Sequence, residues 1–247
     1  MWDTKITLDD DNGYYYLIQD TYPAECPQGD LDRCYVPKYP WIVRLFSFIF
    51  EDNIDFECKA GEFFSPKDEA HFDFSSLSSI KNEIVDKWGI DRVSKYSNEN
   101  EVLARYWKQF GRCSVFFKGI DSGLKFYQKS LELFDKYNMD TILRQSNITP
   151  GKSYTYQEIS EAASKGIGGK HVKMTCVSSY GNKPRKQILD NIGFYMDKNF
   201  NPTNPTDIES PSDRFFTCDR ERVILYQGLM DYVDKERQRI GSIRPIF

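Results

Sequence analysis

The chain has only two histidines among its 247 residues, His71 and His171, and no pair of cysteines separated by two residues. Histidine and closely spaced cysteine build structural zinc sites, so their scarcity argues against a metal centre. The glycine-rich stretch from 165 to 173 lacks the Walker pattern and its strand-to-helix context, and instead predicts a helix end and a turn. The sequence therefore indicates no metal and no cofactor.

A positive net charge and long apolar runs are also absent. The formal charge of −4 and the isoelectric point near 5.4 argue against bulk attraction to nucleic acid or to an anionic membrane. The most apolar stretch, residues 41–50, is interrupted by Arg44 and Ser47 and is shorter than the roughly 18 residues of a membrane span. The beginning, "MWDTKITLDDDNG", has no apolar core of a signal peptide. Either the chain is cytosolic or a leader has been removed.

What the chain does have is an even number of cysteines scattered through the expected loops and element ends. They are Cys26, Cys34, Cys58, Cys113, Cys176 and Cys218. This pattern is typical of three disulfides in an oxidising compartment, and free buried cysteines in a cytosolic protein are the alternative. Asn147 begins a lone glycosylation sequon, Asn-Ile-Thr, a pattern that is frequent by chance.

Aromatic and β-branched residues predict strands, and apolar residues at helical spacing predict helices between them. The expected strands cover residues 14–19, 41–50, 172–177, 192–197 and 222–226. The expected helices cover residues 76–88, 102–110 and 124–134, and a capping box at 155–158 opens another that ends near Gly166. This order predicts an α+β fold, an antiparallel β-sheet with flanking helices, in a single domain over residues 1–226. Residues 227–247 would form a C-terminal extension.

The order of these features resembles the T2 family of secreted ribonucleases over residues 14–226. The stretch "YYYLIQDTYPAEC" carries Gln19 and the following cysteine of the family's Leu-x-Leu-Gln-Trp-Pro segment, with one extra residue. The stretch "VLARYWKQFGRC" aligns without a gap with the family's Phe-Trp-x-His-Glu-Trp-x-Lys-His-Gly-Thr-Cys and keeps Trp107, Gly111 and the cysteine. The run "KYN…ITP…Y…I…A…G…C" downstream continues the similarity.

This resemblance implies a disulfide-stabilised, ribonuclease T2-like fold with a particular cysteine pairing. The pairs would be Cys26–Cys34, Cys58–Cys113 and Cys176–Cys218. The resemblance also implies a protein that is secreted or resides in the lumen of an oxidising compartment.

The resemblance further implies that the catalytic groups are missing. In the family, the RNA 2′-hydroxyl attacks the phosphate, and histidines act as the base that takes its proton and the acid that protonates the leaving 5′-oxygen, with a glutamate and a lysine near the phosphate. Carried over residue by residue, the helical segment's two histidines become Arg105 and Phe110, and its glutamate and lysine become Tyr106 and Gln109. The histidine of the family's first catalytic segment has no counterpart, and Arg44 stands nearest to it. Arginine stays protonated and phenylalanine transfers no proton, so these positions predict a pseudoenzyme.

Three functional hypotheses follow from these substitutions. The first is a catalytically inactive protein that acts through protein contacts, as a structural or accessory subunit of an assembly or as a secreted or luminal binding protein with an unidentified protein partner. The second is an RNA- or nucleotide-binding pseudoenzyme with Arg44 and Arg105 as phosphate-binding residues, unless both pair with surface carboxylates. The third is an active endoribonuclease with a relocated site, in which His71 and His171 would converge on one cleft.

Overall fold

The computed structural model describes residues 13–21, 39–50, 74–90, 98–112, 114, 120–178, 187–205 and 218–228. Its strands are β1 (Gly13–Thr21), β2 (Trp41–Phe50), β3 (Lys152–Tyr154), β4 (Lys173–Ser178), β5 (Gln187–Met196), β6 (Pro202–Thr203) and β7 (Ile224–Tyr226). Its helices are η3 (Phe74–Leu77), α3 (Lys81–Trp88), α5 (Glu99–Tyr106), η4 (Trp107–Gly111), α6 (Gly123–Lys136), α7 (Met139–Gln145) and α8 (Tyr156–Gly166). Within these ranges, the α+β fold expected from the sequence is confirmed.

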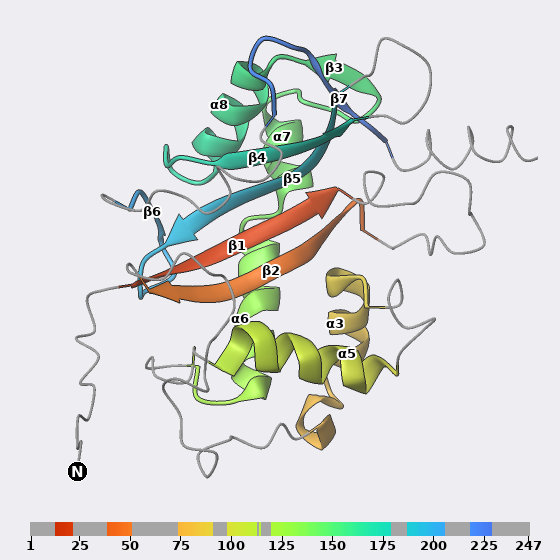
Figure 1. Cartoon of the computed structure of the whole chain (residues 1–247), viewed down its shortest axis with the longest axis vertical. Coiled ribbons are helices and arrows are strands. Elements are labelled where there is room, and N and C mark those ends of the chain that lie inside the picture. Colours follow the sequence, from red (N-terminus) through yellow and green to blue (C-terminus); the bar gives the residue numbers. More distant parts are fainter. Residues whose placement is uncertain are drawn as a thin grey trace, which may run out of the picture.

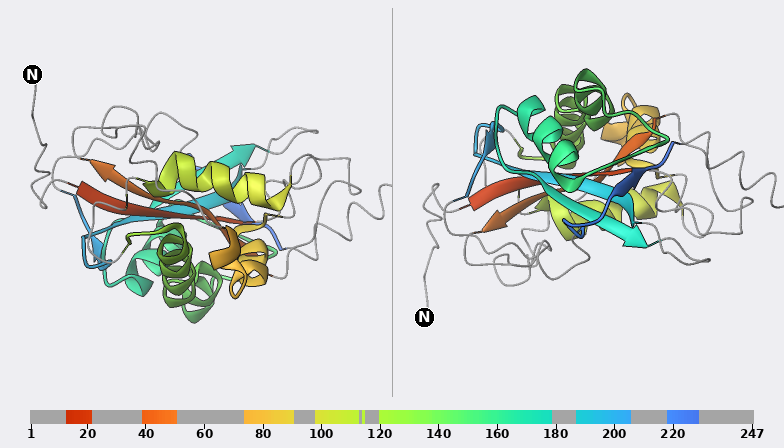
Figure 2. Two further views of the ribbon diagram at one scale, coloured as in Figure 1. Left: turned by 90° about the horizontal axis from the view of Figure 1, so that it is seen from below. Right: turned by 90° about the horizontal axis from the view of Figure 1, so that it is seen from above.

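The strands form one sheet in the order β2-β1-β5-β7-β3, and β4 and β6 also pair with β5. Figure 2 shows α3, α6 and α8 on one side of this sheet and α5 on the other. In Figure 1, α5 lies next to β2, whereas β3, β7 and α8 lie at the far end of the molecule. No helix in the described ranges is long and apolar enough to span a bilayer.

The expectation of a purely antiparallel sheet is wrong at one pairing. Strand β7 runs parallel to β5, with Gln187 opposite Ile224 and Ile188 opposite Leu225. The chain reaches β7 from Cys218, which a disulfide ties to β4, and it enters the sheet in the direction of β5. Strand β3 then pairs antiparallel with β7.

The helix expected over residues 124–134 is present as α6 and ends at Lys136, and a further helix, α7, which the sequence did not predict, follows after Asn138. The side chain of Asn138 accepts a hydrogen bond from the backbone N–H of Thr141 at 3.0 Å and caps α7. The capping box predicted for α8 is present, with Thr155 and Glu158 bonding each other's backbone N–H groups. The glycine-rich turn after α8 is confirmed, since Gly168 and Gly169 both have positive φ.

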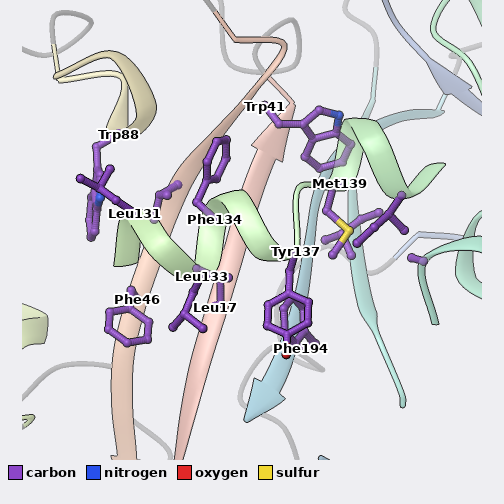
Figure 3. Close-up of a cluster of buried hydrophobic side chains, with 14 of the residues drawn as sticks. Leu17, Trp41, Phe46, Trp88, Leu131, Leu133, Phe134, Tyr137, Met139 and Phe194 are labelled. Atoms are coloured by element: carbon purple, nitrogen blue, oxygen red, sulfur yellow. The ribbon is translucent and has the colours of Figure 1, made fainter. Parts of the chain in front are cut away.

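Helix α6 buries its apolar face on the sheet. Figure 3 shows Leu133 pointing toward Leu17 of β1 and Phe46 of β2, and Tyr137 meets Phe194 of β5 edge to face at 5.4 Å. All five side chains are buried. A fully buried side chain of this size contributes on the order of 1.5–3 kcal/mol, so this face of α6 is a main source of stability.

Gln19 is a buried polar residue in this apolar layer. Its side-chain amide donates to the carbonyl of Tyr137 at 2.8 Å and accepts from the backbone N–H of Met139 at 3.2 Å. Those two backbone groups lie where α6 ends and α7 begins, so their own helices do not satisfy them. Gln19 thus fastens β1 to the junction between the two helices, which gives this residue of the resemblance a structural role.

A second buried polar contact joins β2 to β7. The indole N–H of Trp41 donates to the hydroxyl of Tyr226 at 2.7 Å, and that hydroxyl donates to a carboxylate oxygen of Asp140 at 3.2 Å. The other oxygen of Asp140 accepts from Arg144 at 2.8 Å. Burial raises the pKa of Tyr226 far above its usual value, which keeps the hydroxyl protonated as a donor.

Candidate functional site

The two segments that carry the substituted positions lie side by side. Strand β2 carries Arg44, and the continuous helix of α5 and η4 carries Arg105, Tyr106, Gln109 and Phe110. The hydroxyl of Ser47 on β2 donates to the carbonyl oxygen of Phe110 at 3.5 Å, which ties the strand to the helix end. Asn98 caps the start of α5 by accepting from the N–H of Asn100 at 2.9 Å.

The helix changes its winding where the motif lies. After Tyr106 it continues as a π-helical turn over Trp107–Gly111, an uncommon form that inserts extra backbone into a helix. The sequence predicted a helix ending near Gly111, which is confirmed, but its helical spacing gave no sign of the wider turn. The wider turn sets the directions of Gln109 and Phe110 relative to β2.

Arg44 occupies an irregularity in the pairing of β1 with β2. The register shifts by one residue there, and Arg44 is the extra residue between Val43 and Leu45. Its guanidinium lies 3.5 Å from a carboxylate oxygen of Asp20, which is 1% exposed, whereas the arginine side chain is 49% exposed. A carboxylate of the chain itself therefore offsets part of the charge of Arg44.

Phe110 packs where the resemblance places the second catalytic histidine. Its half-buried ring joins a cluster of Tyr16, Leu45 and Tyr195 on the sheet face opposite to Leu17. The rings of Tyr16 and Tyr195 lie 4.5 Å apart, and Gly193 makes room for them, because a Cβ there would lie 2.5 Å from the Tyr16 hydroxyl. This face therefore holds an aromatic cluster.

Tyr106, which the resemblance aligns with the family's glutamate, also takes part in packing. Its ring lies 5.3 Å from Trp88 of α3 and 5.9 Å from Phe110. Gln109 is half-buried and Arg105 is exposed. The structure thus brings Tyr106 and Phe110 together beside β2, whereas Arg105 faces solvent.

The residues that match the family's motif support the helix from inside. Trp107 is 3% exposed and its ring meets Phe126 of α6 at 5.6 Å. A Cβ on Gly111 would lie 2.3 Å from the Trp107 ring, so only glycine fits there without displacing the ring. The hydroxyl of Tyr127 donates to the Leu103 carbonyl at 2.8 Å, and burial raises its pKa well above the usual value. These contacts hold α5 and η4 against α6.

Of the two histidines, the described residues include only His171, so the relocated site formed with His71 stays a prediction. His171 is exposed and precedes β4 by two residues, and His71 lies outside the described ranges. Across the sheet, Lys173 of β4 lies opposite Gly193 of β5, which lies opposite Ile18 of β1, which in turn lies opposite Leu45 of β2. Three strand spacings, about 14 Å, therefore separate the backbone of β4 from that of β2. No cluster of metal-ligating side chains occurs in the described part of the chain either.

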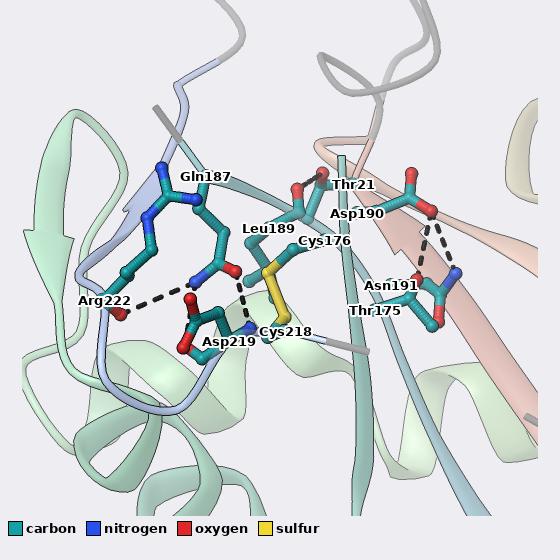
Figure 4. The surroundings of a disulfide bond; sticks show 10 residues. All are labelled: Thr21, Thr175, Cys176, Gln187, Leu189, Asp190, Asn191, Cys218, Asp219 and Arg222. Atoms are coloured by element: carbon teal, nitrogen blue, oxygen red, sulfur yellow. Dashed lines mark hydrogen bonds between the residues drawn. A yellow bond between two sulfur atoms is a disulfide. The ribbon is translucent and has the colours of Figure 1, made fainter. Parts of the chain in front are cut away.

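The cysteine pair Cys176–Cys218 is confirmed as a disulfide between β4 and the segment before β7. Figure 4 shows the side chain of Gln187 beside it, accepting from the N–H of Asp219 at 2.6 Å and donating to the carbonyl of Arg222 at 3.5 Å. The remaining cysteines, Cys26, Cys34, Cys58 and Cys113, and the extension beyond residue 228 lie outside the described ranges, so their predicted pairing and position stay predictions.

Sequence reasoning missed three residues that shape this site. Asp20 gave no signal because its contact with Arg44 depends on the strand register. Tyr16 and Tyr195 meet only because β1 and β5 pair, and the aromatic run 14–16 indicated a buried strand without naming its partner. The period-two alternation of β1 could have placed Asp20 and Tyr16 on one face.

An α+β fold with an internal disulfide and a strand–helix pair at the motif positions defines a ribonuclease-like protein. The chain belongs to the Ribonuclease T2 family, whose sequence profile matches residues 13–206. Ribonuclease T2 of Danio rerio is 32% identical over 95 residues, which are 38% of this chain and 39% of that protein. Ribonuclease Oy of Magallana gigas is 26% identical over 161 residues, 65% of this chain and 73% of that protein.

Solved structures share the fold at lower sequence identity. Human RNase T2 superposes with a TM-score of 0.65 at 16% identity, covering 87% of this chain and 98% of that one. RNase NT, solved in complex with 5′-AMP, gives a TM-score of 0.64 at 16% identity, covering 88% and 98%. An RNase-related protein from Calystegia sepium gives 0.61 at 17% identity, with the same coverage.

Proposed function

We propose that this protein is a catalytically inactive member of the Ribonuclease T2 family that acts through protein contacts. It would be a structural or accessory subunit of an assembly, or a binding protein that is secreted or held in the lumen of an oxidising compartment. The observation that carries the proposal is the packing of Phe110 with Tyr16, Leu45 and Tyr195 at the position of a catalytic histidine.

The side chains at the substituted positions are unsuited to general acid–base catalysis. In the family's reaction the RNA 2′-hydroxyl attacks phosphorus and the 5′-oxygen leaves, so one group must accept a proton and another must donate one, each with a pKa near the working pH. Arginine remains charged and glutamine does not titrate. A tyrosine ordinarily titrates near 10, and Phe110 has no proton to transfer. The Asp20 carboxylate adds no free base, because Arg44 holds it in an ion pair.

The scaffold itself is intact, which favours a role in contacts rather than chemistry. The buried layer around Gln19, the packing of Gly111 on Trp107 and the Cys176–Cys218 disulfide all maintain the fold and do not require the catalytic groups. The disulfide also supports an oxidising location for the mature protein.

We expect the purified protein to leave single-stranded RNA intact between acidic and neutral pH. Incubation of a labelled oligoribonucleotide, with an active T2 ribonuclease as the positive control, measures this directly. Cleavage that survives repurification and disappears in His71→Ala or His171→Ala would contradict the proposal and favour a relocated active site.

The same preparation tests nucleotide binding, the alternative role. RNase NT was solved in complex with 5′-AMP, so a relative binds a nucleotide, and Arg44 and Arg105 are the candidate phosphate ligands here. Salt-sensitive binding of the intact oligonucleotide that is lost in Arg44→Ala and in Arg105→Ala would establish a nucleotide-binding pseudoenzyme instead of a purely protein-binding one.

Contacts with other proteins are tested by the size of the native particle. After gentle extraction from its source, we expect the protein to elute from a sizing column well above its chain mass of 29.0 kDa, together with other chains. Elution as a single chain at that mass would rule out a stable assembly and leave a free binding or storage protein.

A further inference from the structure

The turn between α7 and β3 presents an asparagine side chain to solvent. Asn147 is exposed, and its backbone has φ 61°, a left-handed conformation that asparagine adopts more readily than most residues. Its N–H donates to the carbonyl oxygen of Arg144 at 2.9 Å, and the N–H of Ile148 donates to the carbonyl oxygen of Leu143 at 3.0 Å. These bonds close the end of α7. The Asn147 carboxamide makes no hydrogen bond to other residues in the described ranges.

The next two residues are held inward. Ile148 is 6% exposed and belongs to the main core. The backbone N–H of Thr149 donates to the hydroxyl of Tyr154 at 2.8 Å, and the hydroxyl of Thr149 lies 3.4 Å from the same oxygen. The turn is therefore anchored by Ile148 and Thr149, and Asn147 alone extends from it.

We propose that Asn147 carries an N-linked glycan in the mature protein. In the transfer, the amide nitrogen Nδ2 of Asn147 attacks the anomeric carbon of an oligosaccharide linked to a lipid pyrophosphate. The new carbon–nitrogen bond replaces the carbon–oxygen bond to pyrophosphate, Nδ2 loses one proton, and the lipid pyrophosphate leaves. The residues 147–149 supply the Asn-x-Thr acceptor pattern that this reaction requires.

The structure also assigns an order to attachment of the glycan and closure of the turn at residues 147–149. In the folded chain the Thr149 hydroxyl is occupied by Tyr154 and Ile148 is buried, so the transferase cannot bind the triplet in an extended form. Attachment therefore precedes closure of the turn. Once the turn has closed, the exposed side chain of Asn147 gives the glycan room without disturbing the core.

The chain supplies its own matched controls. Asn201-Pro202-Thr203 and the triplet at 204–206 have the same outer residues, but the central proline prevents them from acting as acceptors. Asn201 is exposed like Asn147, and its N–H is bonded to Asp197 at 2.9 Å in a turn before β6. Exposure alone therefore does not distinguish Asn147 as an acceptor from Asn201. The central residue of the triplet, Ile148 in one and Pro202 in the other, makes the difference.

The test is expression of the full chain behind a secretory leader in glycosylating eukaryotic cells. Intact mass and gel mobility are measured before and after treatment with peptide N-glycosidase. We expect a discrete mass increase that the enzyme removes, leaving aspartate at position 147. The increase should be absent in Asn147→Gln and in Thr149→Ala, and present in Thr149→Ser and Asn201→Gln.

The variant Pro202→Ala keeps the test decisive. It relieves the block at Asn201, so modification of Asn201 in this variant shows that the chain has reached the transferase. The proposal is overturned if Asn147 remains unmodified while Asn201 is modified in Pro202→Ala. It is equally overturned if the increase persists in Asn147→Gln. None of these readouts depends on whether the protein cleaves RNA or binds a partner.

Discussion

Replacing Phe126 with alanine is expected to lower the free energy of unfolding by about 3–5 kcal/mol. The ring is fully buried on α6 and meets Phe46 of β2 at 5.3 Å, Trp107 of η4 at 5.6 Å and Trp88 of α3 at 6.1 Å. Truncation removes contacts to three elements at once. The rings around the gap are themselves held by other contacts, so the cavity cannot collapse fully.

Urea titration followed by tryptophan fluorescence measures this loss as a lower transition midpoint. Phe126→Leu retains most of the volume and should lose less than half as much. Leu124→Ala is the matched control on the same helix, since its side chain is half-buried at the edge of the core. Equal losses for Phe126→Ala and Leu124→Ala would show that the aromatic contacts do not stabilise the fold as described. Removal of the Phe126 ring should also disorder η4, because the ring of Trp107 packs against it.

Removing the Cys176–Cys218 disulfide is expected to cost about 4 kcal/mol. The two cysteines are 42 residues apart, and closing a loop of that length restricts the unfolded chain by about this much. The double variant Cys176→Ala and Cys218→Ala is preferable to a reducing agent, because it leaves other cysteines unchanged and creates no unpaired thiol. The loss is measured as the difference in unfolding free energy between the two oxidised proteins.

The variant Gln187→Ala is a control for the effect of removing the disulfide. Its side chain bonds to the backbone of Asp219 and Arg222 next to the disulfide, and so holds the same segment without a covalent bond. Gln187→Ala should therefore weaken the native state with the disulfide present and weaken it further without it. A loss below about 1 kcal/mol in the double cysteine variant would mean that the loop is already restricted in the unfolded chain.

The sequence was sufficient for β2 and α6, but it predicted only residues 192–197 of the ten-residue strand β5, and it was insufficient where a contact depends on register. The strand predicted over 41–50 has the same bounds in the structure, because its residues are apolar on both faces. Helix α7 was not predicted, because asparagine can occupy either end of a helix and only its contact with the Thr141 N–H shows that Asn138 begins one. Strand β7, with three residues, has too little pattern to reveal that it runs parallel to β5.

In the candidate site, too, residue types could be judged from the sequence, whereas contacts between elements could not. The proposed loss of the acid–base groups rests on the residue types at positions 44 and 105–110 alone, since proton transfer is a property of the side chain itself. The bulge that joins Arg44 to Asp20 could not be foreseen, because it arises from the pairing of two strands. The packing of Phe110 on Tyr16 likewise requires the fold to be known.

The hydrogen bond from Trp41 to Tyr226 has a consequence for biosynthesis. It joins residues 185 positions apart, and Gly151 also donates its N–H to the Tyr226 carbonyl at 2.7 Å. During translation β1 and β2 emerge early, yet the indole of Trp41 and the edge of β3 wait for residues 224–226 to leave the ribosome. The sheet therefore completes its pairing only after residues 224–226 have been synthesised, and until then the edge of β3 and the indole of Trp41 lack these partners.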